Sequence, residues 1–498
     1  MLFRRREASQ ALKYVCLKEI SKMKINPLTG FIICGIALFC VLCSFALSNN
    51  FTGDTGDSIM HYLYAHYAFV HPVLFLNQWA KPLFVLISSP FAQFGFAGIK
   101  IFNCLMATLS CFFTYLVARE LKMKYAYLVL PFMFFCPLYF ILVFSGLTEY
   151  LFGFFLILSI YLTIKRRLVP ALVLVSFLPF IRAEGLIFLG VFSLYIFAER
   201  KWKPLPVLFT GHIIYSIIGY FHYHDILWVF TKLPYANIKS QYGHGGLFDF
   251  VHILNYVIEK PMFRMLGLGY AVLLLRFFKL KNSSVGNEES ILIYGGFAIF
   301  FIAHSVFWWK GIFSSGGFLM PRVMNAGVPL IALIALGGIN FVTGFIKKPV
   351  VNYIITGGLA IYVIVFPFTY RPQGLMFDKK LFVIHENNMI DEKVVPFINK
   401  NFPDYKQHKV YYAHPYLSIA LNIDPFDSLK HGELHSLLND KVSANTPIIW
   451  DDWFSTVEQG MTLQQLSSHK EFVMLSSFEE QEKGRIIQYA IFKTESGY

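Results

Sequence analysis

The sequence is divided into apolar runs of bilayer-spanning length, and short basic clusters separate these runs. A helix needs about 20 consecutive, mainly apolar residues to cross the hydrocarbon core. The runs stop at clusters such as Lys165-Arg166-Arg167 and Lys347-Lys348. With 56% hydrophobic and only 15% charged residues, the chain lies outside the range of ordinary soluble domains. The pattern predicts a mostly α-helical, polytopic integral membrane protein.

The basic clusters also predict how the chain is oriented, because Lys and Arg concentrate in cytoplasmic loops. We expect a cytoplasmic amphipathic segment over 1–27 and about eleven transmembrane helices over 28–369. The first outer loop would cover 48–96. The net charge of +13 comes from these clusters. Without a polybasic stretch carrying interleaved aromatic residues, it does not predict a nucleic acid partner.

The chain changes character after about residue 370 and becomes rich in Asp, Glu, Lys, His and Asn. Its apolar runs there are too short to span a membrane. We predict a small extracytoplasmic α/β domain over 370–498, which in a bacterial inner membrane would lie in the periplasm. Segment 391–401 has a helical pattern, and three segments have strand patterns. These strands are expected at 409–413, 447–450 and 485–492.

Arg182 and Glu184 are two opposite charges inside a long apolar block, 168–198. The block is too long for one span and has basic residues at both ends, so a hairpin of two short helices is expected, with this pair at its outer turn. An Arg at the bilayer centre costs roughly 2.5–3.5 kcal/mol even on mild insertion scales. Two interpretations are open: a structural ion pair between helices, or a polar group facing a watery cavity and a substrate.

Other polar residues follow the ends of predicted outer helices. Asp54 and Asp57 are suited to a general base, although Gly and Asp are also common in solvated turns. Glu149 lies at a predicted helix start, where it could instead be a charge that interacts favourably with the helix dipole. Lys310 lies beside Trp309, where it could instead anchor the chain at the membrane interface. A phosphate headgroup would suit the outer cations, which are Lys81, Arg182, Lys310 and Arg322.

The order of these pieces resembles the GT-C superfamily of polytopic glycosyltransferases, in the branch of the protein O-mannosyltransferases and the bacterial aminoarabinose transferase. Gly56-Asp-Ser-Ile-Met-His-Tyr62 is similar to that family's Asp-Glu-x-x-Tyr-like first-loop motif. Trp79-Ala-Lys-Pro-Leu-Phe84 is similar to its Trp-x-Lys-Pro-Pro segment. Segments 145–149 and 182–185 resemble two further family patterns. The resemblance covers about 25–370, and Ser58 departs from it by replacing the usual second acid.

The resemblance implies an inverting hexosyl- or pentosyltransferase with a lipid-linked donor. Such an enzyme moves a sugar from a polyprenyl-phosphate carrier, among membrane lipids, to a hydroxyl of a protein, lipid or glycan on the outer side. Asp57 would be the general base, with Asp54 as the alternative. The four outer cations would bind the donor phosphate. Sugar-binding or orienting roles would fall to Glu149, Glu184, His61 and Tyr62.

The resemblance implies no required cofactor, although it does not exclude a divalent metal. The cysteines show no metal-ligand spacing. A second function class, a secondary transporter or lipid-linked substrate flippase, would use Arg182 and Glu184 as its substrate site. Transporters often carry inverted repeats with paired broken helices. Only one broken block is evident, at 168–198, so the sequence favours the enzyme.

The charge pattern makes a topological prediction. A reporter fused after Lys165 should be cytoplasmic, and one fused after residue 370 should be extracytoplasmic. Fusions to alkaline phosphatase and to a cytoplasmically fluorescent protein measure the two locations. Finding both fusion points on the same side would rule out the eleven-helix arrangement.

Overall fold

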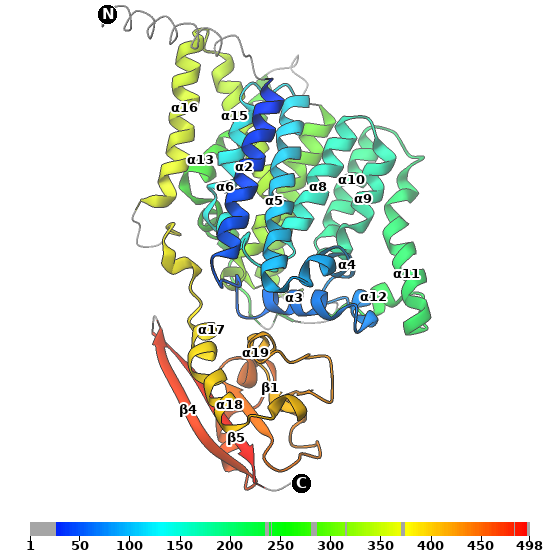
Figure 1. Ribbon diagram of the computed structural model, residues 1–498. Helices are drawn as coiled ribbons and strands as arrows, with labels where there is room; N and C mark the ends of the chain where they lie inside the picture. The colour runs from blue at the N-terminus through cyan, green and yellow to red at the C-terminus, as the bar shows by residue number, and fades with distance from the viewer. Residues whose placement is uncertain are drawn as a thin grey trace, which may run out of the picture.

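The structure, a computed structural model, describes residues 26–234, 239–240, 242–279, 286–313, 316–369, 374–482 and 484–495. It contains a helical bundle and, beyond one end of that bundle, a smaller part with a β-sheet (Figure 1). The amphipathic segment predicted over 1–27 lies outside the described residues, except for its last two.

Apolar helices of membrane-spanning length form the bundle, as expected for an integral membrane protein. Among the described residues, six stretches are long and apolar enough to span: Pro27–Leu47 (α2), Gly95–Glu120 (α5), Leu205–Tyr223 (ending in α11, Thr210–Tyr223), Glu288–Lys310 (ending in α14, Gly296–Lys310), Pro321–Gly344 (ending in α15, Val328–Gly344) and Pro349–Phe368 (beginning with α16, Pro349–Val365). Shorter helices complete the bundle: α6 (Val129–Phe134), α7 (Pro137–Leu142), α8 (Glu149–Ile164), α9 (Leu168–Phe177) and α10 (Gly185–Ala198), with the kinked α13 (Asp249–Lys279). The count of eleven spans remains a prediction.

The hairpin predicted within 168–198 is confirmed. Helix α9 continues as a 3-10 turn to Phe180, and α10 begins at Gly185. A Cβ on Gly185 would lie 2.3 Å from the backbone of Leu178 and Pro179, so only glycine fits the close return of the chain. Arg182 and Glu184 therefore lie in the break between two short helices.

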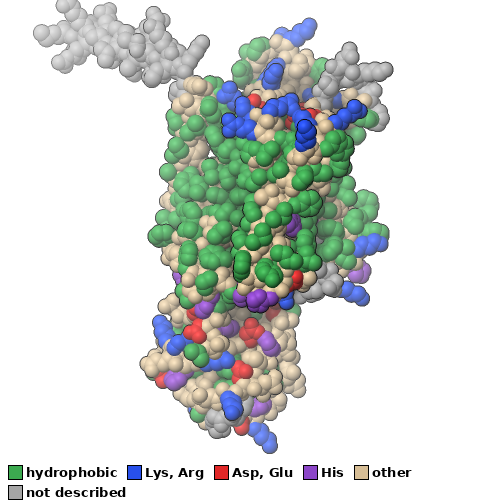
Figure 2. Space-filling model, turned by 90° about the vertical axis from the view of Figure 1, so that its right-hand side faces the viewer, with side chains coloured by type: hydrophobic (Ala, Val, Ile, Leu, Met, Phe, Trp, Pro, Cys, Tyr) green, Lys and Arg blue, Asp and Glu red, His purple; other side chains and the backbone are tan. Residues whose placement is uncertain are grey.

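The two ends of the bundle differ in charge. Figure 2 shows Lys and Arg side chains gathered at the end away from the β-sheet. Ion pairs join loops there, between Lys165 and Glu120 at 3.2 Å and between Arg166 and Glu288 at 2.7 Å. The opposite end contains the segment predicted as the first outer loop. It includes two helices, α3 (Asp57–Tyr67) and α4 (Pro82–Ala92), close to the sheet-containing part (Figure 1).

The C-terminal part has a helix at 385–401, formed by α17 (His385–Met389), a π-turn and α18 (Val395–Asn401), where the sequence predicts one. A five-stranded sheet has the order β2-β1-β3-β5-β4. Its strands are β1 (Val410–Tyr412), β2 (His431–Gly432), β3 (Pro447–Asp451), β4 (Phe472–Glu482) and β5 (Arg485–Thr494). The predicted strands correspond to β1, β3 and β5. The long edge strand β4, which pairs antiparallel with β5, is not predicted, because its second half is polar and lacks a buried apolar face.

The C-terminal part packs directly on residues 48–96, the predicted first outer loop, which we call the first outer segment. His71 Nε2 lies 2.8 Å from Asp424 Oδ2, and Asn387 Nδ2 donates to Thr52 Oγ1 at 3.0 Å. These contacts join residues more than 300 positions apart in the sequence. The sheet-containing part therefore covers the same end of the bundle as α3 and α4.

Helices α13 and α15 approach each other closely through glycines. A Cβ on Gly269 would lie 2.3 Å from the carbonyl oxygen of Ile334, and one on Gly338 would lie 2.9 Å from the backbone nitrogen of Gly269. Small residues allow such backbone contact between membrane helices, where dispersion supplies much of the association energy.

This packing predicts different effects for two glycines of α13. Gly269→Ala should lower the free energy of unfolding by about 1–3 kcal/mol, because the new methyl group forces α13 and α15 apart. Gly267→Ala is the matched control, since a Cβ there meets no atom within 4 Å. Thermal unfolding of the purified variants in detergent measures both. Equal midpoints for the two variants would contradict the close contact.

Candidate functional site

Six charged side chains from distant parts of the sequence form one connected set of ion pairs at the end of the bundle that faces the C-terminal part. We call this set the charged cluster. It combines the first outer segment, the start of α8, the hairpin turn and the 3-10 turn before α15. Its members are Asp54, Asp57, Glu149, Arg182, Glu184 and Arg322.

Arg322 holds the two first-segment aspartates together. Its Nη1 lies 2.5 Å from Asp54 Oδ2, and its Nη2 contacts Asp57 Oδ2. Its Nε lies 3.8 Å from Glu149 Oε1. A guanidinium presents several donors in a fixed plane, so one arginine can align several carboxylates. Arg322 therefore fixes the distance between the two candidate bases.

The two aspartates differ in what their second oxygen does. Asp54 Oδ1 accepts from the backbone N–H groups of Gly56 at 3.1 Å and Ser58 at 2.8 Å, so both of its oxygens are occupied at the start of α3. Among the described residues, only Arg322 hydrogen-bonds the Asp57 carboxylate. The Asp57 side chain is also more exposed, at 37% against 25% for Asp54. Asp57 is therefore the more accessible of the two candidate bases.

Arg182 lies between two glutamates. Its Nη1 is 2.7 Å from Glu149 Oε1, and its Nη2 is 2.7 Å from Glu184 Oε1. Arg182 also donates to Thr148 Oγ1 at 3.0 Å. The Glu149 side chain is only 1% exposed and lies within ion-pair distance of both arginines. Glu149 thus connects the hairpin turn to Arg322 and the aspartates.

Two tight turns bring the first outer segment against the start of α8. Ser58 Oγ accepts from the backbone N–H of Gly146 at 2.7 Å, and a Cβ on Gly146 would lie 2.3 Å from the Ser58 carbonyl oxygen. A Cβ on Gly53, whose φ is +88°, would lie 2.3 Å from Ser145 Cβ. Asn103 donates to the Ser145 carbonyl at 2.7 Å. Ser58, which replaces the usual second acid, is therefore a packing and hydrogen-bonding residue.

Lys81 is buried beside the cluster at the N-terminus of α4. Its Nζ donates to the Gln78 carbonyl at 2.9 Å, and its backbone has φ +69° immediately before Pro82. A left-handed backbone is unfavourable for a non-glycine residue, and such outliers concentrate at functional sites. Burial lowers the pKa of Lys81 to about 8, against the opposing effect of Glu184. A bound anion would oppose this shift, because it favours the protonated amine.

The remaining sequence-predicted residues differ in position. His61 is buried and stacks on Trp79 at 5.0 Å between ring centroids. Burial lowers its pKa to about 3, so its ring is neutral within electrostatic range of Asp57. The Tyr62 ring packs against Phe96. Lys310 is exposed, with its Nζ 3.7 Å above the Trp309 ring. The structure does not bring Tyr62 or Lys310 to the charged cluster.

Two further residues of the site are absent from the sequence prediction. Thr148 contacts Arg182 through its hydroxyl and makes no side-chain cap to α8. His304 on α14 is buried, with its Nε2 3.8 Å from Glu184 Oε1. A single His inside a predicted span is a signal for such a site, because polar side chains in spans usually face the bundle interior.

The carboxylates of the charged cluster are ion-paired with Arg182 and Arg322, so their counter-charges come from the protein itself. Within the described ranges, no group of three or more His, Cys, Asp and Glu side chains is arranged to hold a metal ion.

The pairing around Arg182 predicts a stability effect. Arg182→Met should lower the free energy of unfolding by about 3–5 kcal/mol, because it leaves Glu149 and Glu184 buried without their main partner. Arg167→Met, at an exposed position at the start of α9, is the control and should have little effect. Denaturant or thermal unfolding in detergent measures the difference. A stable Arg182→Met protein would mean that the two glutamates are not held as charged groups.

No known family model matches the sequence, and no curated protein matches it. Solved structures do match the fold. The crystal structure of ArnT from Cupriavidus metallidurans bound to undecaprenyl phosphate aligns with a TM-score of 0.59, covering 93% of this chain and 98% of that one at 10% identity. The apo structure of the same protein aligns with a TM-score of 0.58, covering 94% of this chain and 98% of that one at 10% identity. ArnT is an aminoarabinose transferase of the GT-C type, so the resemblance to that superfamily is confirmed at the level of fold.

Proposed function

We propose that this chain is a membrane glycosyltransferase that moves a sugar from a polyprenyl-phosphate carrier to an acceptor hydroxyl, with inversion. The observation that carries the proposal is the meeting of an accessible carboxylate, Asp57, with buried cations in one cluster on a GT-C-like fold. The undecaprenyl phosphate bound to ArnT in its crystal structure supports a lipid phosphate as the donor's carrier.

In this reaction Asp57 is the general base. Its carboxylate takes the proton of the acceptor hydroxyl while that oxygen attacks the anomeric carbon, and the bond from that carbon to the phosphate oxygen breaks. One displacement inverts the anomeric configuration. Arg322 keeps Asp57 oriented, and Asp54 holds Arg322 and the start of α3 in place. We assign to His61 the role of orienting the sugar or the acceptor, because it is buried within electrostatic range of Asp57.

The donor phosphate would be bound first by Lys81, with Arg182 and Arg322 as further partners. Both arginines are ion-paired with carboxylates, and burial lowers the pKa of Lys81, so a nearby anion would favour the charged form of this lysine. Glu149 and Glu184 orient Arg182, and Glu184, the more exposed of the two, is assigned to the sugar. Lys310 and Tyr62, which lie outside the cluster, are not included in this proposal.

The charge of the bundle ends supports an orientation. If the end rich in Lys and Arg is cytoplasmic, the charged cluster opens on the outer side. The domain at 370–498 would then lie above it, in the periplasm of a bacterial inner membrane, with the transmembrane catalytic domain at 28–369.

A transporter is not favoured. The substrate sites of such proteins lie near the bilayer midplane between repeats. Here the aspartates at the start of α3 lie at the end of the bundle, next to the C-terminal part (Figure 1).

The proposal predicts different losses for the two aspartates. Purified protein given a polyprenyl-phosphate-linked sugar and an acceptor should release polyprenyl phosphate. Asp57→Asn should slow this release by about 10²–10⁴-fold, because the amide cannot take the proton. Asp54→Asn should slow carrier release less, because an Asn side chain also accepts hydrogen bonds well at the start of a helix. The measurement is the rate of carrier release, with carrier binding measured separately.

Asp404→Asn, an exposed carboxylate of the C-terminal part, is the control and should react at the parent rate. An inactive Asp54→Asn protein beside an active Asp57→Asn protein would transfer the base assignment to Asp54. No carrier release by the parent protein with any lipid-linked sugar would overturn the proposed activity.

A further inference from the structure

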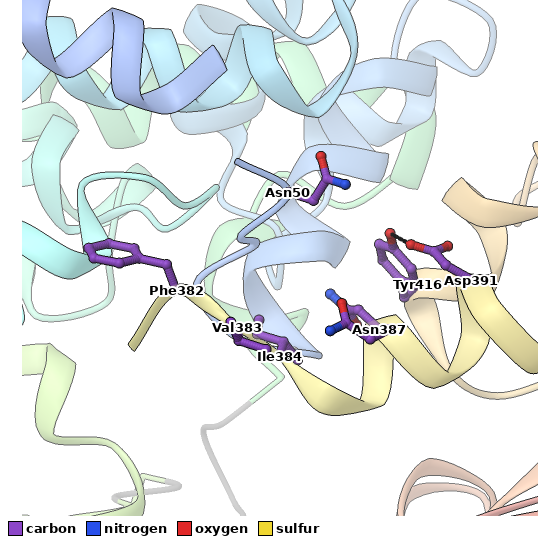
Figure 3. Close-up of a pocket in the computed structure, with 8 residues that line it drawn as sticks. Asn50, Phe382, Val383, Ile384, Asn387, Asp391 and Tyr416 are labelled. Carbon is purple, nitrogen blue, oxygen red and sulfur yellow. Dashed lines mark hydrogen bonds between the residues drawn. The ribbon is translucent and has the colours of Figure 1, made fainter. Parts of the chain in front are cut away.

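A polar cavity lies between Asn50 of the first outer segment, residues 382–384, which we call the linker, and the C-terminal part from α17 onward (Figure 3). Its volume is about 170 Å³, room for several water molecules or one sugar ring. Figure 3 shows Asn50 from the first outer segment on one side and residues of the C-terminal part on the other. The apolar linker residues 382–384 complete the wall.

Asn387 is the most deeply buried polar residue of the lining. This side chain is only 3% exposed and lines the cavity. Its amide nitrogen donates to Thr52 Oγ1 at 3.0 Å, but its Oδ1 has no hydrogen-bond partner among the described residues. A buried acceptor left unpaired is unfavourable, and native structures rarely keep one without a partner from solvent or a ligand.

The lining indicates the chemistry of that ligand. It contains three amides, one carboxylate and one phenol, in Asn50, Asn387, Asn388, Asp391 and Tyr416. None of the described residues around the cavity is basic, so an anion has no counter-charge there. Amides and carboxylates accept and donate hydrogen bonds as sugar hydroxyls require. The apolar linker wall suits the C–H face of a sugar ring. A neutral polyhydroxyl ligand matches this lining better than a phosphate or an acyl chain.

The cavity is connected to the candidate base. Thr52 Oγ1 accepts from Asn387 and donates to the backbone carbonyl of Asp54 at 2.7 Å. Asn50 lies in the same extended stretch that leads to Asp54 and Asp57. Two hydrogen bonds thus connect the cavity to the backbone of Asp54, on the acceptor side of the proposed site, whereas Lys81 and Arg182 form its phosphate side.

We propose that this cavity is a saccharide subsite for the acceptor, so that the acceptor carries a sugar next to the hydroxyl that is glycosylated. This inference rests on the proposed function. It assigns the acceptor to the class of glycans and glycan-bearing lipids, with Asn387 and Asn388 as hydrogen-bonding residues and Asp391 held by Tyr416 Oη at 2.8 Å.

Saturation-transfer NMR of the full chain in nanodiscs tests this subsite. The probes are the methyl glycosides of glucose, galactose, mannose and N-acetylglucosamine, at concentrations on the order of 1 mM, as expected for a small ligand. At least one glycoside should bind. Asn388→Ala, at the exposed rim of the cavity, should weaken that binding about tenfold by removing a hydrogen bond. Asn401→Ala, exposed at the end of α18, is the matched control and should bind as the parent does.

Competition separates the acceptor from the donor as the source of the sugar. Bound methyl glycoside should remain when undecaprenyl phosphate or undecaprenyl-phosphate-glucose is added. Displacement by the lipid-linked glucose alone would mean that the cavity holds the donor's sugar, and would overturn the acceptor assignment. No glycoside binding, or equal binding by Asn388→Ala and the parent, would overturn the subsite while carrier release still supports the transferase. Glycoside binding without carrier release would remove the transferase and leave a sugar-binding site.

Discussion

The site depends on one buried carboxylate. Glu149 is almost fully enclosed, 2.7 Å from Arg182 and 3.8 Å from Arg322. A buried glutamate in this setting is tolerable only with cations around it, and each arginine in turn needs its own second carboxylate. Glu184 and the two aspartates supply these. The members of the charged cluster therefore depend on one another, and removing one of them leaves a neighbouring charge buried without its partner.

The turns that hold the cluster are packed so closely that they leave no space for movement. Gly53 and Gly146 each approach the opposite turn at distances that exclude a Cβ, and Ser58 bonds across the gap. Lys81 adds an unfavourable backbone conformation that the surrounding structure must hold. In the proposed transfer, such rigidity would keep hydrogen-bond donors aimed at the place where charge develops, without reorganisation during the reaction. The same packing connects the aspartates to the cavity at Asn387 through Thr52.

The sequence predicts those features that arise from local patterns. The apolar runs identify helices, and the break in 168–198 follows from its length and flanking charges. Contacts between segments that are distant in the chain produce no pattern in the local sequence. Arg322 and Asp57 are 265 positions apart, so their contact could be inferred only from a family resemblance. Local sequence also cannot separate two roles of Lys310: a cation beside a span end suits a phosphate, and the same cation stacks on the Trp309 ring. The strand β4 escapes prediction because one half carries mostly polar residues.

Charge conservation gives the cluster a direct part in the proposed transfer. Four carboxylates lie near three cations, Lys81 and the two arginines, so the cluster itself has no surplus of positive charge. A sugar phosphodiester brings one negative charge, and the departing phosphate leaves with one more. Asp57 loses one charge when it takes the acceptor proton, so the total around the cluster is unchanged. In the proposed transfer, Arg322 then has one charged carboxylate fewer among its three partners and can stabilise the phosphate. The ion pair that holds the base before reaction thus becomes available to the leaving group during it.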